Sequence, residues 1–351
     1  MKKFKNIKMK KIIKKFAKDF KERISFRKYA IFFLALVILS SPFVIEYFKL
    51  LKPIILKPSL AKQVLFIEPE EKEAPILREI EKAQKSINLE MYLLSDKKII
   101  QALKDAKKRG VEIKIILEKN PYNLEWFNKK IFKELKEVGI QTQWSNSEFS
   151  LTHSKFMIID DQKAIIMTCN FTYSGLNNSR DFGLINFDLK DVLEIKKLFE
   201  ADWQKESFFS SRPNLVISPI NSRFKLESLI KNAKSEILIA TEIMKDQSIQ
   251  ELLIKAQKNG VQVKILLADI KTGEINRDTG KYFQTQNMQV KYLQKPFLHA
   301  KIMIIDNKIL YLGSINFSSA SMDENRELGI LLVNKALIQQ VRDVFEKDWT
   351  I

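Results

Sequence analysis

Two segments of the chain carry the same pattern of residues and predict its fold. Residues 151–172 read LTHSKFMIIDDQKAIIMTCNFT, and residues 297–318 read FLHAKIMIIDNKILYLGSINFS. In each segment a polar turn that begins at Asp160 or Asp306 separates two apolar runs, which is typical of a β-hairpin. Because strand side chains alternate between two faces, a His and a Lys two positions apart share one face. Each segment therefore predicts a hairpin that presents an imidazole and an ammonium group on a common surface.

The similarity continues outside these segments at a constant spacing. An offset of 146 residues relates His153 to His299, and the same offset relates the helices that end near Trp203 and Trp349. Upstream of each hairpin, an amphipathic helix ends at a glycine and a β-branched strand follows, which is the pattern of an α/β unit. A repeat of this length predicts two similar α/β domains about a pseudo-twofold axis rather than a solenoid. We place the two halves at residues 63–205 and 206–351.

The amino-terminal region has a different composition. Residues 1–28 contain 13 Lys and Arg against two acids, and the next seventeen residues, from Tyr29 to Ile45, carry no charge. We expect a basic cytoplasmic tail over 1–28, one transmembrane helix over 29–46 and a linker over 47–62. A cleaved signal peptide is the alternative, which the long basic leader and the lack of a small-residue cleavage site disfavour.

This arrangement predicts a single-pass membrane protein with a cytoplasmic amino terminus and an exported catalytic part. The richness in Lys and Ile suggests an AT-rich prokaryotic genome, and hence a prokaryotic cell membrane. Of the formal net charge of +18, only +7 belongs to residues 29–351, so the charge of the whole chain is weak evidence for nucleic-acid binding. The single cysteine, Cys169, excludes an intramolecular disulfide and a multi-cysteine metal site.

Further polar residues are expected near each His and Lys. Thr168 and Asn170 follow the second strand of the first hairpin, and Ser314 and Asn316 take the same places in the second. In one copy alone, a core histidine and a lysine reaching out from a strand end would explain the pattern. Its repetition favours a cavity that suits a tetrahedral anion such as phosphate and needs no metal. The predicted catalytic residues are His153, Lys155, Asn170, His299, Lys301 and Asn316.

The pattern His-x-Lys-x4-Asp followed by Gly-Ser-x-Asn resembles the signature of the phospholipase D superfamily. This chain resembles the members with two such motifs across residues 63–351. The second copy is complete, whereas the first has Met167 and Thr168 in place of Gly-Ser, which keeps a hydroxyl but adds a Cβ that would limit the approach of backbone to phosphate. The resemblance implies two α/β/α sandwich halves and neither a metal nor another cofactor.

The resemblance also implies a mechanism in which one histidine attacks phosphorus to form a phosphohistidine and the other protonates the leaving alcohol. We assign His153 as the nucleophile and His299 as the acid and base. Glu327 resembles the family's acidic residue that orients the histidine, and Asp181 is its shorter equivalent, so we expect looser orientation in the first half. The residues assigned to phosphate binding or to support of the histidines are Thr168, Ser314, Asp181, Glu327, Asp160 and Asp306.

Two groups of residues are given structural rather than catalytic roles. Asp160 and Asp306 end strands at tight turns, where Asp commonly caps its own backbone. The aromatic residues that precede the first motif would line the cleft or pack in the core, and we favour the core. They are Trp126, Phe127, Trp144 and Phe149.

The leading functional hypothesis is a membrane-anchored phospholipase D-type hydrolase of a phospholipid head-group phosphodiester, because the anchor keeps the site near lipid. The alternatives are an anchored or exported endonuclease, a phosphatidyltransferase of the cardiolipin synthase type, and a non-catalytic binding module. The complete His, Lys and Asn sets of both halves argue against the last. The substrate is thus a phospholipid or another phosphodiester, nucleic acid is possible, and no obligate protein partner is evident.

Overall fold

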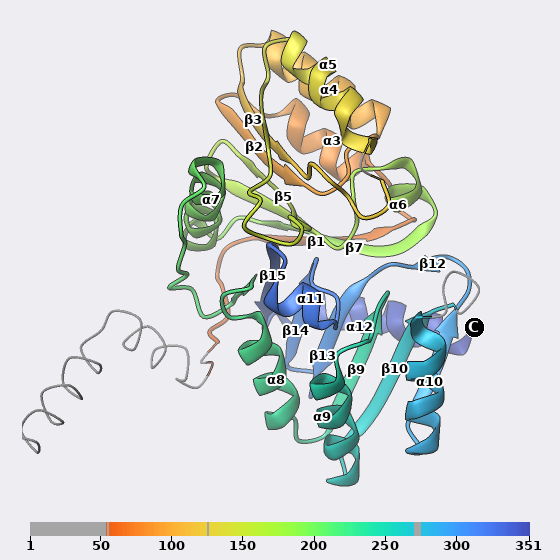
Figure 1. Cartoon of the computed structure of the whole chain (residues 1–351). Coiled ribbons are helices and arrows are strands. Elements are labelled where there is room, and N and C mark those ends of the chain that lie inside the picture. The colour runs from red at the N-terminus through yellow and green to blue at the C-terminus, as the bar shows by residue number, and fades with distance from the viewer. Residues whose placement is uncertain (1–53, 55, 125, 270–274) are drawn as a thin grey trace, which may run out of the picture. The chain divides into compact units, whose positions relative to one another are not determined.

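The computed structural model describes residues 54, 56–124, 126–269 and 275–351, and residues 54–351 belong to one compact unit (Figure 1). The predicted basic tail and the predicted anchor lie outside the described residues, as does half of the predicted linker. Among the helices that are described, none has both the length and the apolar character needed to cross a bilayer.

The first half is built on a mixed β-sheet. Its strands are β1 (Gln63–Glu68), β2 (Ser86–Met91), β3 (Glu112–Leu117), β4 (Gln141–Trp144), β5 (Lys155–Ile159), β6 (Lys163–Met167) and β7 (Ser179–Asn186). They lie in the order β1-β7-β6-β5-β2-β3-β4, with β2, β3 and β4 parallel and the other neighbours antiparallel. Because β5 is buried along its whole length, its residues after Lys155 are continuously apolar rather than alternating.

The second half repeats this sheet. Its strands are β8 (Leu215–Ser218), β9 (Glu236–Thr241), β10 (Gln262–Ala268), β11 (Gln289–Leu293), β13 (Lys301–Ile305), β14 (Ile309–Gly313) and β15 (Glu327–Leu332). Read from β8, their order is β8-β15-β14-β13-β9-β10-β11, which matches the first sheet strand by strand. The prediction of two similar α/β halves is therefore confirmed. The short strand β12 (Phe297–Leu298) crosses over and pairs with β7 of the first sheet.

Helices cover the sheets in equivalent places. Those of the first half are α3 (Ala74–Glu81), α4 (Lys97–Lys108), α5 (Phe127–Glu137), α6 (Tyr173–Asn177) and α7 (Leu189–Gln204). Those of the second half are α8 (Ser222–Asn232), α9 (Gln247–Lys258), α10 (Ile275–Thr285), α11 (Ser319–Asp323) and α12 (Lys335–Thr350). Helices α3, α4 and α5 share an apolar core with the first sheet, and α8, α9 and α10 share one with the second, so these helices form the two outer layers (Figure 1).

The helix ends explain why the sequence pattern repeats. Asp96 and Asp246 cap α4 and α9, where their side chains accept hydrogen bonds from backbone N–H groups of the first turn. Gly110 and Gly260 follow the same helices with φ of 95° and 89°, a left-handed conformation that glycine adopts without strain. These local signals turn the chain from each helix into β3 or β10.

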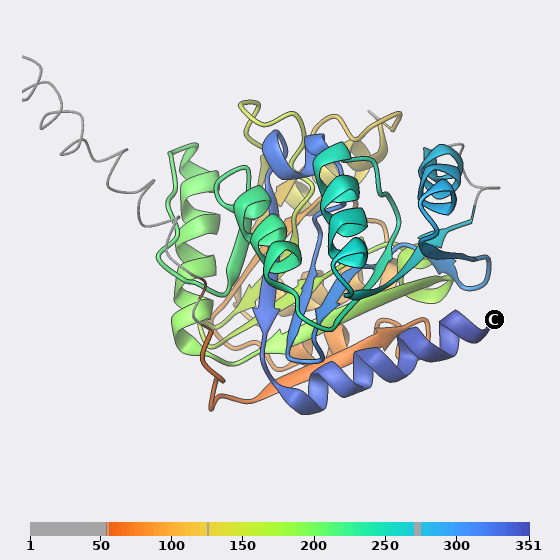
Figure 2. The same cartoon turned by 90° about the horizontal axis from the view of Figure 1, so that it is seen from below.

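A third apolar core lies between the two sheets and joins the halves. It contains residues of both sheets together with Phe199 of α7 and Phe345 of α12. Figure 2 shows α7 and α12 as long helices on different sides of the molecule. Because this core draws on both halves, the two halves are held together by buried apolar surface as well as by polar contacts.

Candidate active site

The predicted catalytic residues of each half lie at the end of the sheet where the parallel strands, β2 or β9, have their carboxyl ends. Lys155 opens β5 opposite Met91, the last residue of β2, and Lys301 opens β13 opposite Thr241, the last residue of β9. The carboxyl ends of parallel strands are where α/β proteins usually hold their ligands. The prediction that each His lies on the same strand as its Lys is wrong, because both strands begin only at the lysines.

Each histidine is held by backbone from the opposite half. The N–H of His153 donates to the carbonyl of Arg326 at 2.8 Å, and the Nε of Arg326 donates to Asp202 of α7 at 3.0 Å. Arg180 makes the reciprocal contacts, with the N–H of His299 at 3.2 Å and with the last helix, α12. The histidine loops are therefore fixed by contacts that exist only when both halves are folded together.

The acidic partners of the histidines also cross between the halves. Nδ1 of His153 lies 2.9 Å from Oε2 of Glu327, and Nδ1 of His299 lies 3.1 Å from Oδ1 of Asp181. The expectation that Asp181 orients the histidine of its own half is wrong, because β7 and β15 each present their acid to the other half. The shorter acid thus supports His299, and the longer one supports His153.

The environment of His153 favours the neutral imidazole. Burial and then the charge of Lys155 lower the pKa of His153 to about 4, although Glu327 opposes this shift. Since a carboxylate only accepts hydrogen bonds, the proton of the neutral ring is on Nδ1, and Nε2 keeps its lone pair. A neutral imidazole held in this tautomer, with its side chain 12% exposed, is suited to nucleophilic attack.

The two lysines are buried and reach back to the histidine loops. Nζ of Lys155 donates to the carbonyl of His153 at 2.6 Å, and Nζ of Lys301 donates to that of His299 at 2.5 Å. Burial chiefly lowers the pKa of Lys155 to about 7, and the charge of Lys301 acts in the same direction. A buried cation of this kind gains most from an anion that binds beside it.

The sequence analysis missed two residues at the carboxyl ends of β2 and β9. Tyr92 follows β2 and lies edge-on to the ring of His153, at 4.6 Å between ring centroids. Glu242 follows β9, and its Oε2 lies 2.7 Å from Nζ of Lys301 and 3.5 Å from Nε2 of His299. In the sequence, the feature that could have identified them is that each directly follows the equivalent strand of its half, at the carboxyl end where ligands usually bind. Seeing this requires an alignment of the strands that precede the two hairpins.

The hydroxyls of Thr168 and Ser314 contact neighbouring side chains or backbone rather than the histidine rings. Thr168 donates to Oδ1 of Asp181 at 2.6 Å, the same oxygen that faces His299. Among the described residues, the hydroxyl of Ser314 bonds to the backbone of Leu328 alone, donating to its carbonyl at 3.3 Å and accepting from its N–H at 3.1 Å. Thr168 therefore acts on an acid that supports a histidine, whereas Ser314 fixes the start of β15.

Asn170 and Asn316 are the remaining predicted catalytic residues. The side-chain oxygens of Asn170 and Asn316 are buried and have no hydrogen-bond partner among the described residues. Because an amide carries two donors as well as an acceptor, both side chains can donate to the oxygen of a bound anion.

The difference between Met167 and Gly313 concerns packing. A Cβ on Gly313 would lie 2.3 Å from the Cα of Gly329 on the neighbouring strand, so this position requires glycine. Met167 is buried in the first-half core opposite Gly183, whose lack of a side chain leaves room for the Met sulfur. The expectation that Met167 limits the approach of backbone to phosphate is wrong, because the side chain points into the core.

Asp160 and Asp306 lie at the far ends of β5 and β13 from the lysines, and the structure does not bring them to the site. Oδ1 of Asp160 accepts from the N–H groups of Lys85 and Ser86 at 2.7 and 2.9 Å. Asp306 caps the equivalent backbone before β9. The prediction of a capping role describes both residues, but the capped backbone belongs to a neighbouring segment rather than to their own turn.

The aromatic residues before the first motif have different environments. Trp126 is 68% exposed, so the prediction that it packs in the core is wrong. Trp144 is half-buried and stacks on Phe132 with ring centroids 3.8 Å apart. The loop that contains Trp126 also contains Tyr122, whose N–H donates to the hydroxyl of Tyr92 at 2.7 Å. This loop therefore borders the site.

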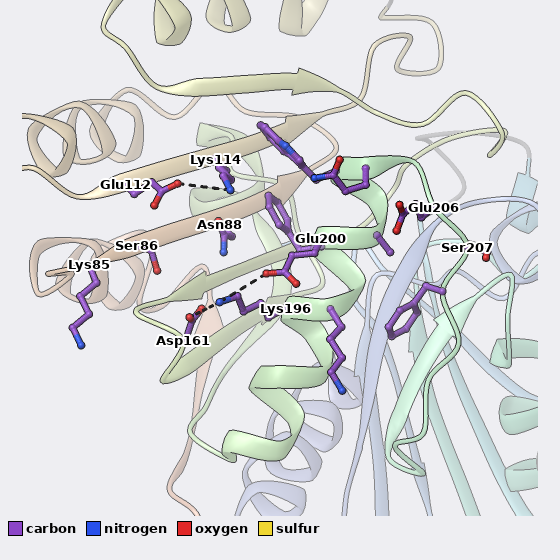
Figure 3. A pocket seen from close by; sticks show the side chains of 16 residues that line it. Lys85, Ser86, Asn88, Glu112, Lys114, Asp161, Lys196, Glu200, Glu206 and Ser207 are labelled. Atoms are coloured by element: carbon purple, nitrogen blue, oxygen red, sulfur yellow. Dashed lines mark hydrogen bonds and ion pairs between the residues drawn. The ribbon is translucent and has the colours of Figure 1, made fainter.

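A separate surface pocket of about 750 Å³ lies on the first half (Figure 3). It is lined by the amino ends of β2 and β3 and by α7, with Lys196 paired to Asp161 and Lys114 paired to Glu112. None of the predicted catalytic residues lines it, because they lie at the opposite ends of these strands. The described residues hold no group of three or more His, Cys, Asp or Glu side chains arranged to bind a metal ion.

Comparison with known proteins agrees with this architecture. The chain is 26% identical over 324 residues to a protein named cardiolipin synthase from Clostridium perfringens (strain SM101 / Type A), an alignment that covers 78% of this chain and 67% of the relative. The crystal structure of phosphatidylserine synthase from Haemophilus influenzae Rd KW20 superposes with a TM-score of 0.63 at 13% identity, covering 83% of this chain and 87% of that one. The structure of polyphosphate kinase from Porphyromonas gingivalis gives a TM-score of 0.67 at 16% identity, covering 84% of this chain but 50% of that one. At these identities the two structures show the fold alone.

Two α/β halves that bring a His, a Lys and an Asn each to one site define the architecture of the phospholipase D superfamily, as the sequence motifs predict. The chain belongs to the family described as "Cardiolipin synthase, PLD-like domain", whose model matches residues 76–203 and 226–349.

Proposed function

We propose that this protein is a phosphatidyltransferase of the cardiolipin synthase type. The observation that carries the proposal is the match to the family described as "Cardiolipin synthase, PLD-like domain" over both halves, and the unequal pair of histidines supports the phosphoryl-transfer chemistry that this family match implies. The names of the relatives favour transfer to an alcohol over the hydrolysis that the sequence analysis favoured. Transfer and hydrolysis share the same first step and differ only in the acceptor.

In the first step, Nε2 of His153 attacks the phosphorus of a phosphatidyl donor. The bond from phosphorus to the leaving alcohol oxygen breaks, and that oxygen takes a proton from Nε2 of His299. Asp181 contacts Nδ1 of His299 at 3.1 Å, which leaves Nε2 as the ring nitrogen that faces the leaving group. Lys155 and Asn170 are placed to hold the non-bridging oxygens as negative charge develops.

In the second step, the hydroxyl of an acceptor attacks the phosphohistidine. The acceptor proton passes to His299, the bond between phosphorus and His153 breaks, and both histidines return to their starting states. Cardiolipin contains two phosphatidyl groups joined by glycerol, so a glycerolipid with a free glycerol hydroxyl is the acceptor that this proposal requires.

The loop that borders the site supports a lipid substrate. Tyr122 and Trp126 are 74% and 68% exposed, and their loop is tied to Tyr92 beside His153. Tyr and Trp are enriched where proteins meet the membrane interface, because each ring combines an apolar body with a polar tip. We further propose that residues 29–46, outside the described residues, anchor the protein in a prokaryotic cell membrane with the catalytic part exported.

The test uses the full chain and vesicles of phosphatidylglycerol, with excess EDTA present. We expect cardiolipin and glycerol to form in equal amounts, as followed by mass spectrometry. The variant His153→Ala should form neither product, whereas Glu200→Gln, a charge change on the exposed face of α7, should leave the rate unchanged.

The products separate the candidate functions. Phosphatidate without cardiolipin would replace transfer by hydrolysis at the same site. Cleavage of single-stranded DNA with no change in the lipid would overturn the lipid proposal in favour of a nuclease. Cardiolipin formation by His153→Ala would overturn the phosphohistidine mechanism.

A further inference from the structure

The two lysines of the site differ in what surrounds their charge. Nζ of Lys155 lies 5.1 Å from the ring centroid of Tyr92, and no carboxylate pairs with it among the described residues. Nζ of Lys301 lies 2.7 Å from Oε2 of Glu242. Glu242 and Tyr92 occupy the same position after β9 and β2, so one half has a carboxylate where the other has an aromatic ring. The first half thus offers an uncompensated cation, and the second half offers a neutralised one.

The same oxygen of Glu242 also faces the second catalytic histidine. It lies 3.5 Å from Nε2 of His299, the ring nitrogen that Asp181 does not contact. Lys301 and Nε2 of His299 are, with Asn316, the groups of the second half that a substrate phosphoester would contact. Glu242 therefore stands in the part of the site where a second negative charge of a ligand would lie.

Glu242 is ionised in this position. Burial alone would raise its pKa, but the charges of Lys301 and His299 hold the pKa of Glu242 well below its usual range. Its side chain is 25% exposed, so it lies at the open side of the site rather than in the core. A fixed negative charge at contact distance repels a bound anion in proportion to the charge of that anion.

We propose that Glu242 selects ligands by charge, admitting the monoanion of a phosphodiester and rejecting the dianion of a phosphomonoester or of inorganic phosphate. This inference rests on the proposed function only in taking the site to bind phosphoesters. A phosphodiester has one negative charge, which Lys155 and Asn170 can hold in the first half. A phosphomonoester has a second pKa near 6 and is dianionic above it, so its second charge would meet Glu242. The same repulsion keeps free phosphate from occupying the site.

The test measures binding directly, so that it does not depend on turnover. The full chain is titrated calorimetrically at pH 7, close to the pKa of Lys155, with inorganic phosphate, about half of which is the dianion at this pH, and with diethyl phosphate, a monoanion. For Glu242→Gln we expect the affinity for inorganic phosphate to rise at least about tenfold, while that for diethyl phosphate rises less than about threefold. Glu242→Asp keeps the charge and should keep the selectivity of the unaltered protein. Glu200→Gln is the matched control, because it removes the same charge from a site on α7.

Two outcomes would overturn the proposal. Equal gains for both ligands would mean that Glu242 weakens anion binding without selecting by charge. A loss of affinity for both ligands in Glu242→Gln would mean that Glu242 positions Lys301. Failure of the proposed function would be recognised separately, since a protein that makes no cardiolipin can still show the contrast between the two phosphates.

Discussion

The two halves of the molecule have the same strand order and the same His, Lys and Asn positions, yet their sites differ in charge. In the first half, His153 and Lys155 have lowered pKa values and face the ring of Tyr92. In the second half, Glu242 lies against both the histidine and the lysine. The difference teaches that a duplicated fold can divide two chemical roles by changing one residue beside each motif.

This division assigns the nucleophile to the half that has Tyr92 where the other half has Glu242. A nucleophile must be unprotonated, and burial beside a lysine keeps His153 neutral. The other histidine, His299, has Asp181 at Nδ1 and Glu242 at 3.5 Å from Nε2, a surrounding that His153 lacks. The crossing of Glu327 and Asp181 between the halves links the two roles, because the carboxylate at Nδ1 of each histidine comes from the opposite half.

The largest effect on turnover should come from replacing each catalytic histidine by alanine in turn. With bis(p-nitrophenyl) phosphate, whose leaving group needs no acid, we expect His153→Ala to lower turnover by at least about 10⁴-fold and to form no phosphoenzyme. His299→Ala should still form an acid-labile phosphohistidine but release it slowly, as detected by rapid quench. The opposite pattern would mean that the roles of the two halves are reversed.

The crossed acids should give the next largest effects. We expect Glu327→Gln and Asp181→Asn each to lower kcat by about 10³-fold, because each removes the charge that orients a catalytic imidazole. Rapid-quench measurement with the activated diester should show slow phosphohistidine formation only for Glu327→Gln. If Asp181→Asn slowed that step instead, the pairing across the halves would be contradicted.

The pH dependence sharpens the comparison of the two lysines. We expect kcat/KM to rise as pH passes about 4, where His153 loses its proton, and to fall above about 7, where the free enzyme loses the charge of Lys155. The fall should approach tenfold for each pH unit. Lys155→Arg should move the alkaline limb upward, since a guanidinium keeps its proton. An unchanged alkaline limb would assign it to another group.

The smallest effect on catalysis should come from replacing Asp160 or Asp306, and the result should be the same in both halves. Asp160→Asn and Asp306→Asn weaken charge-assisted hydrogen bonds to backbone N–H groups, so each should lower the free energy of unfolding by about 1–3 kcal/mol. Denaturant titration measures this loss, and kcat should stay within about twofold. A large loss of kcat at normal stability would give these residues a catalytic role.

Local patterns in the sequence were enough to predict much of the molecule. The two hairpins follow from apolar runs around a polar turn, and the duplication follows from a constant offset between matching residues. The His, Lys and Asn sets could be named because the same side chains recur in both copies. These features depend on residues close together in the chain, where the period of a strand fixes which way side chains point.

Only the tertiary structure decided which acid supports which histidine and how the two halves differ in charge. Glu327 meets His153 across 174 positions of the chain, and Asp181 meets His299 across 118. The spacing of residues within a motif carries no information about these contacts, because each contact joins residues of different halves. The same holds for the proton states: the pKa of His153 depends on burial and on charges brought near by folding, and the role of Glu242 depends on its distance from Lys301 and His299.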